Sequence, residues 1–493
     1  MAKVTTIIDI GSNSMRMVTF KKTSRFAFHL INESKSKVKI SQGCYENGGN
    51  LQDIPMQRAF DALKSFVNIA KNLQSRKILC VATSALRDAP NAKLFLNRVS
   101  KDIGLNIKVI DGTQEAYYGG VATRNLIACD DFTTVDIGGG STEFAFIKEN
   151  NIIDTVSLNI GTVRIKELYL KKSIAFDKND LKGAKEYIIS QLEQINMKLP
   201  TIVGLGGTAR AISRTIIKKD NYPLNILHGF EYETSNNMEL LETIVNATTA
   251  KDLKALGVRK DRFDTIATGT FIFQTILEYF EVKRVITSGV GVREGVFLSD
   301  LLRNTNDKFP ANFNISVRSL LDRFVDDNRQ SAYLGNNAKK IFDILAPIHK
   351  LDEKYKSILV IASKLQLVGL SLEYYKSQKH SFWYILNGLS YGFTHSDKVL
   401  IATVSKFSKK TLPKQSDIKE YKNLLPKIEV IQWLNFMMTF NMTLNQEFSR
   451  EQFEFELDGK MLNIKSSKEL YLVKNELLGI KSPVKLKIGF LVK

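Results

Sequence analysis

The chain has 493 residues, which exceeds a single compact core and predicts three to four domains. Its three cysteines, Cys44, Cys80 and Cys129, lack metal-site spacing, and no stretch approaches ~20 uncharged apolar residues, which argues against a disulfide framework and a membrane span. The net charge of +19 indicates a polyanionic partner (nucleic acid, polyphosphate or an acidic membrane surface), although a lysine-rich proteome would produce the same excess.

The first part of the chain shows alternating strand and helix patterns. Val4–Ile10 is a β-rich run whose apolar part is short and contains Asp9, so it reads as a strand and not as a signal peptide. With a reducing compartment indicated by the cysteines, we expect a cytoplasmic protein. A hairpin partner at 16–20, helices at 56–73 and 92–103, and strands at 78–82 and 107–110 predict an α/β lobe over residues 1–125.

The pattern restarts near Asp130 and predicts a second α/β lobe over residues 126–306. A strand at 132–137 ends in three glycines, and a strand at 141–147 follows them. Asp9-Ile-Gly-Ser-Asn-Ser and Asp136-Ile-Gly-Gly-Gly-Ser therefore share one form: an apolar strand, an aspartate, a glycine-rich turn and hydroxyl residues. We expect two lobes of similar topology facing a cleft.

Beyond residue 306 the pattern becomes mainly helical. Helices at 317–324, 338–349 and 355–370 predict a helical domain over 307–447. From residue 448, short β-like runs at 453–457 and 484–488 predict a small α+β segment over 448–493. The excess of positive charge is shared by both halves of the chain and is denser over residues 307–493.

Four glycine-rich turns follow predicted strands. Such a turn lets backbone N–H groups converge on an anion, because the absent side chains permit close approach and positive φ angles. One turn is weak evidence, because glycine also makes plain hairpins, whereas four at strand ends favour phosphate binding. The turns are Gly11–Ser14, Gly138–Ser141, Gly204–Arg210, which opens a helix, and Ser288–Gly295.

Acidic residues beside these turns suit metal-assisted chemistry on phosphate. Mg²⁺ accepts one or two carboxylates and keeps most of its waters, and Asp136 and Glu143 flank the triple-glycine turn. Glu115 begins a helix after the strand at 107–110, where it can deprotonate a water for attack on phosphorus. Considered singly, Glu143 would be a solvated strand residue and Glu115 a helix N-terminal acid favoured by the dipole.

Together these stretches resemble the exopolyphosphatase/guanosine-pentaphosphate phosphohydrolase family, a branch of the acetate- and sugar-kinase/heat-shock-protein/actin superfamily. The matching motifs occur in family order over residues 4–300. They are Ile8-Asp-Ile-Gly-Ser-Asn-Ser14, Val81-Ala-Thr-Ser-Ala-Leu-Arg-Asp-Ala-Pro-Asn91, Asp111-Gly-Thr-Gln-Glu-Ala116, Val135-Asp-Ile-Gly-Gly-Gly-Ser-Thr-Glu143, Gly204-Leu-Gly-Gly-Thr-Ala209 and Gly289-Val-Gly-Val-Arg-Glu-Gly295. The resemblance implies a two-lobed actin-like (ribonuclease-H-like) α/β fold for the N-terminal half.

The resemblance also implies roles for individual residues. Glu115 falls at the position of the catalytic glutamate that activates the attacking water, and Asp136 and Glu143 fall at the metal-associated acids. It implies Mg²⁺, with another divalent cation or K⁺ left open, in-line water attack without a covalent intermediate, and a homodimer. The segments expected to line the phosphate path hold Asp9, Gly11, Ser12, Asn13, Ser14, Arg87, Gly138, Gly139, Gly140, Ser141, Thr142, Gly206, Gly207 and Thr208.

The helical section is similar to the C-terminal domain of the long family members, which is related to His-Asp metal phosphohydrolases. That similarity lies in Gln378–Ile385 and Ile401–Val404. A metal site there requires a His-Asp or His-Glu pair, and the expected place holds Gln366 and Leu367. We therefore interpret this domain as catalytically inactive, serving as a basic extension of the polyphosphate path or as a dimer contact.

Three alternatives stay open at this point. The first is an ATP-using kinase or ATPase of the same superfamily, although Glu115 and the Arg-Asp-Ala-x-Asn run favour hydrolysis. The second is a polyphosphate or alarmone sensor without activity, which the intact acids at 115, 136 and 143 argue against. The third, nucleic-acid binding, is not favoured because no recognisable module is present. The sequence does not choose between polyphosphate and guanosine pentaphosphate as substrate.

Overall fold

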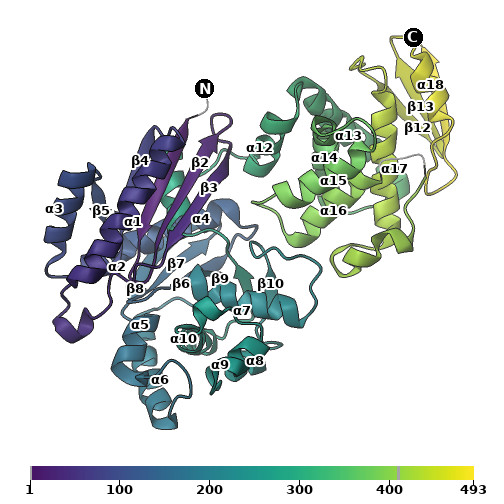
Figure 1. Ribbon diagram of the computed structural model, residues 1–493. Coiled ribbons are helices and arrows are strands. Elements are labelled where there is room, and N and C mark those ends of the chain that lie inside the picture. Colours follow the sequence, from purple (N-terminus) through teal and green to yellow (C-terminus); the bar gives the residue numbers. More distant parts are fainter. Residues whose placement is uncertain (1–2, 408–410, 493) are drawn as a thin grey trace. The chain divides into compact units, whose positions relative to one another are not determined.

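The computed structural model describes residues 3–407 and 411–492 (Figure 1). The chain divides into two compact units, Met1–Phe313 and Asn314–Lys493. Across the described ranges, every helix is too short or too polar to cross a membrane.

The first sheet of unit 1 has five strands in the order β3-β2-β1-β4-β5. β1 (Val4–Ile10), β2 (Met15–Lys22) and β3 (Phe28–Ser36) form an antiparallel ribbon, and β4 (Lys77–Ala82) and β5 (Ile107–Val109) continue the sheet in parallel. α1 (Asp53–Asn72) and α3 (Ala92–Ile103) bury their apolar faces against this sheet. The parallel pairing brings the carboxyl ends of β1, β4 and β5 to one edge.

The second sheet repeats this arrangement, in the order β10-β11-β9-β6-β7-β8. β6 (Phe132–Ile137), β7 (Thr142–Lys148) and β8 (Asn151–Leu158) are antiparallel, β9 (Thr201–Leu205) and β11 (Arg284–Thr287) are parallel to β6, and β10 (Glu231–Glu233) is added at the edge. β1 in the first sheet and β6 in the second have neighbours in the same order and the same directions on both sides. The prediction of two lobes with similar topology is confirmed.

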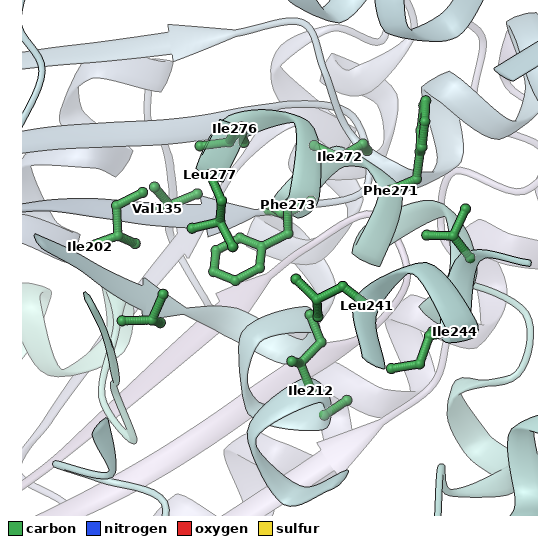
Figure 2. Packing of buried hydrophobic residues seen from close by; sticks show 14 of the residues in the cluster. Val135, Ile202, Ile212, Leu241, Ile244, Phe271, Ile272, Phe273, Ile276 and Leu277 are labelled. Atoms are coloured by element: carbon green, nitrogen blue, oxygen red, sulfur yellow. The ribbon is translucent and has the colours of Figure 1, made fainter. Parts of the chain in front are cut away.

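An extensive hydrophobic core lies in the second lobe. Figure 2 shows Phe273, Ile276 and Leu277 of α10 (Ile266–Tyr279) lying against Val135 of β6 and Ile202 of β9. α7 (Gly206–Lys219) and α8 (Met238–Val245) complete the layer. Removing a buried aromatic such as Phe273 from a core of this kind typically costs about 3–5 kcal/mol. The ends of β6 and β9 therefore project from a rigid base.

Two helices that follow the cleft loops pack against each other at very close range. They are α4 (Gly112–Leu126) and α11 (Val292–Leu301). A Cβ at Gly295 would lie 1.8 Å from the carbonyl oxygen of Tyr118, so only glycine permits this approach. The contact fixes the position of α4, which carries Glu115 in its first turn.

Unit 2 is a helical layer followed by a small sheet. Its helices are α12 (Ile315–Phe324), α13 (Asn328–His349), α14 (Lys354–Leu365), α15 (Ser377–Gly388), α16 (His395–Lys406) and α17 (Ile428–Leu444). β12 (Glu454–Asp458), β13 (Met461–Ser466) and β14 (Lys487–Val492) form the sheet, with α18 (Tyr471–Leu477) between β13 and β14.

Several boundaries in unit 2 differ from the sequence prediction. The helix predicted over 355–370 ends at Leu365 and continues as 3₁₀ turns over Gln366–Ser371. Gly369 lies in these turns, where a Cβ would lie 2.0 Å from the carbonyl oxygen of Ser377. α13 begins ten residues earlier than predicted, where Asp327 caps it by accepting from the N–H of Arg329 at 2.9 Å. The last strand begins at Lys487 and not at Val484, since its pairing with β13 starts at Met461.

Candidate active site

A cleft of about 180 Å³ is lined by residues of both lobes of unit 1. The glycine turns that follow β1 and β6 meet there, since a Cβ at Gly139 would lie 3.1 Å from the Cβ of Ser12. The N-terminus of α7 forms a further part of the wall. The predicted residues that line the cleft are Asp9, Gly11, Ser12, Asn13, Ser14, Glu115, Asp136, Gly138, Gly139, Ser141, Glu143, Gly206, Gly207 and Thr208.

Three predicted phosphate-path residues do not line this cleft. The Thr142 side chain is fully buried and its hydroxyl donates to the Ile160 carbonyl at 2.5 Å. Gly140 presents its carbonyl oxygen to the Arg164 Nε at 2.9 Å. The Arg87 guanidinium lies 3.4 Å from Glu115 Oε2, so it contacts the predicted catalytic carboxylate and not the open volume.

The β1–β2 and β6–β7 hairpins carry different partners for their aspartates. Asp9 lies directly opposite Arg16 across β1 and β2, whereas Asp136 lies opposite Glu143 across β6 and β7. Directly opposed residues project from the same face with Cβ atoms ~5 Å apart. The turn of the first lobe therefore carries an acid–base pair, and that of the second lobe carries two carboxyl groups.

The carboxyl groups of the cleft are buried close to one another. Burial raises the pKa of Asp9 to about 6, against the opposing effect of Arg293 and Arg16. Burial also raises the pKa of Glu143 to about 7. The pKa of Glu115 lies well above its usual range, because burial and then the neighbouring Glu143 carboxylate disfavour its ionised form. A cation bound among these groups would favour their ionised forms and lower these pKa values.

Arginines also line the cleft. Burial and the neighbouring Arg16 lower the pKa of Arg210 to about 10. Arg293 and Arg16 reach Glu33 at 3.3 and 3.9 Å. This cluster was not predicted from sequence. One signal was present: Arg210 ends the Gly204–Arg210 glycine run that opens α7, beside the helix N-terminus where an anion is expected.

The donor set of the second lobe fits a divalent cation. A Cβ at Gly206, whose φ is +73°, would lie 2.1 Å from Asp136 Oδ1, so the glycine admits the carboxylate against the loop. Glu143 Oε1 accepts from the Ser157 hydroxyl at 3.0 Å. The residues that the structure describes contain no group of three or more His, Cys, Asp or Glu able to hold a metal. Two carboxylates completed by water and phosphate oxygens match the preference of Mg²⁺.

Glu115 is positioned by the start of α4. Asp111 caps this helix by accepting from the N–H of Gln114 at 2.7 Å, which places Glu115 in the first turn. Gly112 brings the turn against β8, since a Cβ there would lie 2.4 Å from the Ser157 hydroxyl oxygen. The Glu115 side chain is 15% exposed. A carboxylate with a raised pKa beside a phosphate cleft is suited to act as a general base.

Two actin-like lobes with acids, arginines and glycine cradles facing one cleft define a phosphohydrolase of the two-lobed actin/sugar-kinase class. The chain belongs to the Ppx/GppA phosphatase family: the family model matches residues 18–304, and the model of domain III of the family matches residues 314–481.

Several relatives support this membership. The guanosine-5'-triphosphate,3'-diphosphate pyrophosphatase of Pseudoalteromonas translucida is 28% identical over 421 residues, covering 83% of this chain and 81% of its own. That of Photobacterium profundum is 26% identical over 404 residues, covering 80% and 78%. The crystal structure of the Aquifex aeolicus family member has a TM-score of 0.54 and 28% identity, over 62% of this chain and 99% of its own. An exopolyphosphatase of Cytophaga hutchinsonii, 22% identical over 62% of this chain and 100% of its own, has the same fold with a TM-score of 0.57.

Proposed function

We propose that this phosphatase removes the terminal phosphate of inorganic polyphosphate or of guanosine 5'-triphosphate 3'-diphosphate by in-line attack of water. The observation that carries the proposal is that Glu115, Asp136 and Glu143 share one buried cleft with the glycine turns. Relatives named for each of the two substrates support the substrate class.

In this proposal each side of the cleft has its own task. Glu115 accepts the proton of the attacking water. Backbone N–H groups at the start of α7 hold phosphate oxygens, and Arg16, Arg210 and Arg293 offset the negative charge that shifts to the leaving group. Asp136 and Glu143 are the residues that would hold Mg²⁺, which would neutralise phosphate oxygens when bound.

The direct test is phosphate release by the purified protein with Mg²⁺, measured in parallel on long-chain polyphosphate and on guanosine pentaphosphate. Release from polyphosphate alone makes the protein an exopolyphosphatase, and release from the nucleotide alone places it in alarmone metabolism. No release from either substrate would overturn the proposal.

A second pocket supports a substrate with further anionic groups. It holds about 230 Å³, shares Arg16, Lys35, Arg210 and Arg262 with the cleft, and adds Arg214 and Arg259, with Asp261 as the one acid among its lining residues. Both candidate substrates carry phosphates beyond the one hydrolysed, and each can place charge there.

The Arg214→Gln and Arg259→Gln double variant is expected to raise KM for the preferred substrate about 10-fold with kcat nearly unchanged, since two charge contacts remote from the reacting phosphorus are lost. Inorganic triphosphate, which has fewer phosphates to place in the second pocket, should show a smaller change. Arg303→Gln, which removes an exposed arginine paired with Asp300, is the matched control. An unchanged KM in the double variant would remove this pocket from the substrate path.

Mg²⁺ is expected to raise the Tm of the wild-type protein at pH 8 and much less at pH 5.5. The pKa of Glu143 is raised to about 7, so the folded protein holds this proton more tightly than the unfolded chain, and protein without metal loses stability as pH rises through about 7. Because Mg²⁺ requires the ionised carboxylate, proton competition at Glu143 alone weakens its binding roughly 30-fold at pH 5.5. Differential scanning calorimetry checks this, and Glu143→Gln should abolish the shift at pH 8. Equal shifts at both pH values would contradict the assignment.

The cellular setting is part of the same proposal. Cys44 and Cys80 are buried and all three cysteines, including Cys129, are free, which supports a reducing compartment such as the cytoplasm. A homodimer is proposed on the family membership, and sedimentation equilibrium tests it.

A further inference from the structure

The residues of the Arg87-Asp88-Ala-x-Asn91 run have different roles. Asn91 closes a two-way pair with the backbone of Leu51, accepting from its N–H at 2.8 Å and donating to its carbonyl at 2.9 Å. Asn91 therefore fixes the loop that leads into α1. This leaves the two charged residues of the motif, Arg87 and Asp88, which lie at the end of the short helix α2 (Ser84–Arg87).

Arg87 and Asp88 belong to a line of charged contacts that runs from one lobe to the other. Arg87 Nη1 lies 3.4 Å from Glu115 Oε2, and its Nε donates to Asp88 Oδ1 at 3.2 Å. Asp88 Oδ2 lies 3.7 Å from Nη2 of Arg164, which belongs to α5 (Thr162–Ile165) of the second lobe. Arg164 Nε in turn donates to the Gly140 carbonyl at 2.9 Å.

The segment that carries Arg164 holds the triple-glycine turn. The N–H groups of Thr162 and Val163 donate to the carbonyls of Gly138 and Gly139 at 2.9 and 2.8 Å. A shift of Arg164 therefore moves the phosphate cradle of the second lobe, and a shift of Arg87 moves the group that faces Glu115. Asp88 contacts both arginines.

The Asp88–Arg164 ion pair contributes little to the free energy of unfolding, so its effect is on the positions of the residues it joins. Asp88 is 43% exposed, and ion pairs of such exposure contribute on the order of 0–1 kcal/mol to stability. Catalysis is more sensitive, because a displacement of ~1 Å can cost ~10²-fold in rate. The same contact can therefore matter little for folding and much for turnover.

We propose that Asp88 and Arg164 are positioning residues, which couple the approach of the two lobes to the orientation of Arg87 against Glu115. The inference rests on the proposed function of the cleft and adds to it a link between lobe closure and the base. No contact of Asp88 or Arg164 with substrate is required.

The test compares Asp88→Asn and Arg164→Gln with Asp102→Asn, which removes an exposed carboxylate paired with Arg98 on α3. The first two variants are expected to lower kcat about 10-fold with KM within 2-fold, as misplacement and not lost binding predicts. Asp88→Glu, which keeps the carboxylate, should restore most of kcat. The double variant should be no slower than the slower single one, because both changes break one link.

A second readout needs no turnover. Hydrogen exchange at the Thr162 and Val163 amides is expected to accelerate in Asp88→Asn, up to about 5-fold, which corresponds to about 1 kcal/mol. Asp88 lies in the other lobe and reaches these amides through its contact with Arg164. If wild-type protein releases no phosphate, the proposed function fails while exchange still reports on the link. Wild-type kcat together with wild-type exchange in Asp88→Asn would overturn the inference.

Discussion

The Glu115→Gln variant is expected to lose phosphate release by about 10²- to 10⁴-fold in kcat, the usual contribution of a general base, while KM changes less than 3-fold. The amide keeps the size of the side chain and cannot accept the proton of the attacking water. Single-turnover phosphate release and equilibrium binding of polyphosphate separate the two quantities.

The control for this variant is Glu239→Gln. Glu239 is also a first-turn acid, in α8, and it is exposed outside the cleft. It tests whether loss of a helix N-terminal charge alone slows the enzyme. The pH profile gives a further check: because the pKa of Glu115 is raised by burial and by Glu143, kcat/KM of the wild type should fall on the acid side at a pH well above the usual glutamate range. Near-normal turnover of Glu115→Gln would remove Glu115 from the mechanism.

The Gly206→Ala variant is expected to lose Mg²⁺-dependent activity at least ~10²-fold and to lower the free energy of unfolding by about 2–4 kcal/mol. Two effects combine at this position. The φ of +73° costs a non-glycine residue about 1 kcal/mol, and the new Cβ would lie 2.1 Å from Asp136 Oδ1, so the carboxylate must move. Moving Asp136 displaces a proposed metal ligand by about 1 Å or more, and such displacement is costly for the reaction.

Gly104→Ala separates these effects. Gly104 ends α3 with a φ of +71°, and a Cβ there meets no atom within 4 Å. It therefore carries the same backbone strain without the clash, and we expect a loss of about 1 kcal/mol with normal activity. Urea unfolding and Mg²⁺-dependent phosphate release measure both variants. Equal stability and activity of the two proteins would show that Asp136 tolerates the added carbon.

Much of the fold is predictable because buried strands have a strong sequence signal. β1 and β6 are apolar runs that end at aspartate and glycine turns, and the structure gives both the predicted bounds. β3 and β8 were not predicted, since their residues are largely polar and only partly buried. Edge position explains this: one side of each strand has no partner, so hydrophobic alternation is weak.

The proximity of site residues was predictable from the sequence where the residues belong to one motif. Asp136 and Glu143 lie on one hairpin, so their proximity follows from a single turn. Arg16 and Arg293 come from separate elements, and their approach depends on the packing of two lobes, which no local pattern encodes. Gly295 belongs to a glycine-rich run read as an anion loop. Gly291 of that run lines the cleft, whereas Gly295 permits the close contact of α11 with Tyr118.

The unlike partners of the two aspartates have a consequence for substrate polarity. With Arg16 facing Asp9 and Glu143 facing Asp136, the duplicated hairpins are inverted in charge at one equivalent position. A symmetric pair of hairpins would present the same potential from both sides, and a phosphate chain could lie in either sense. The inversion instead creates an electric field across the cleft, so the two ends of a bound chain are inequivalent before any bond breaks.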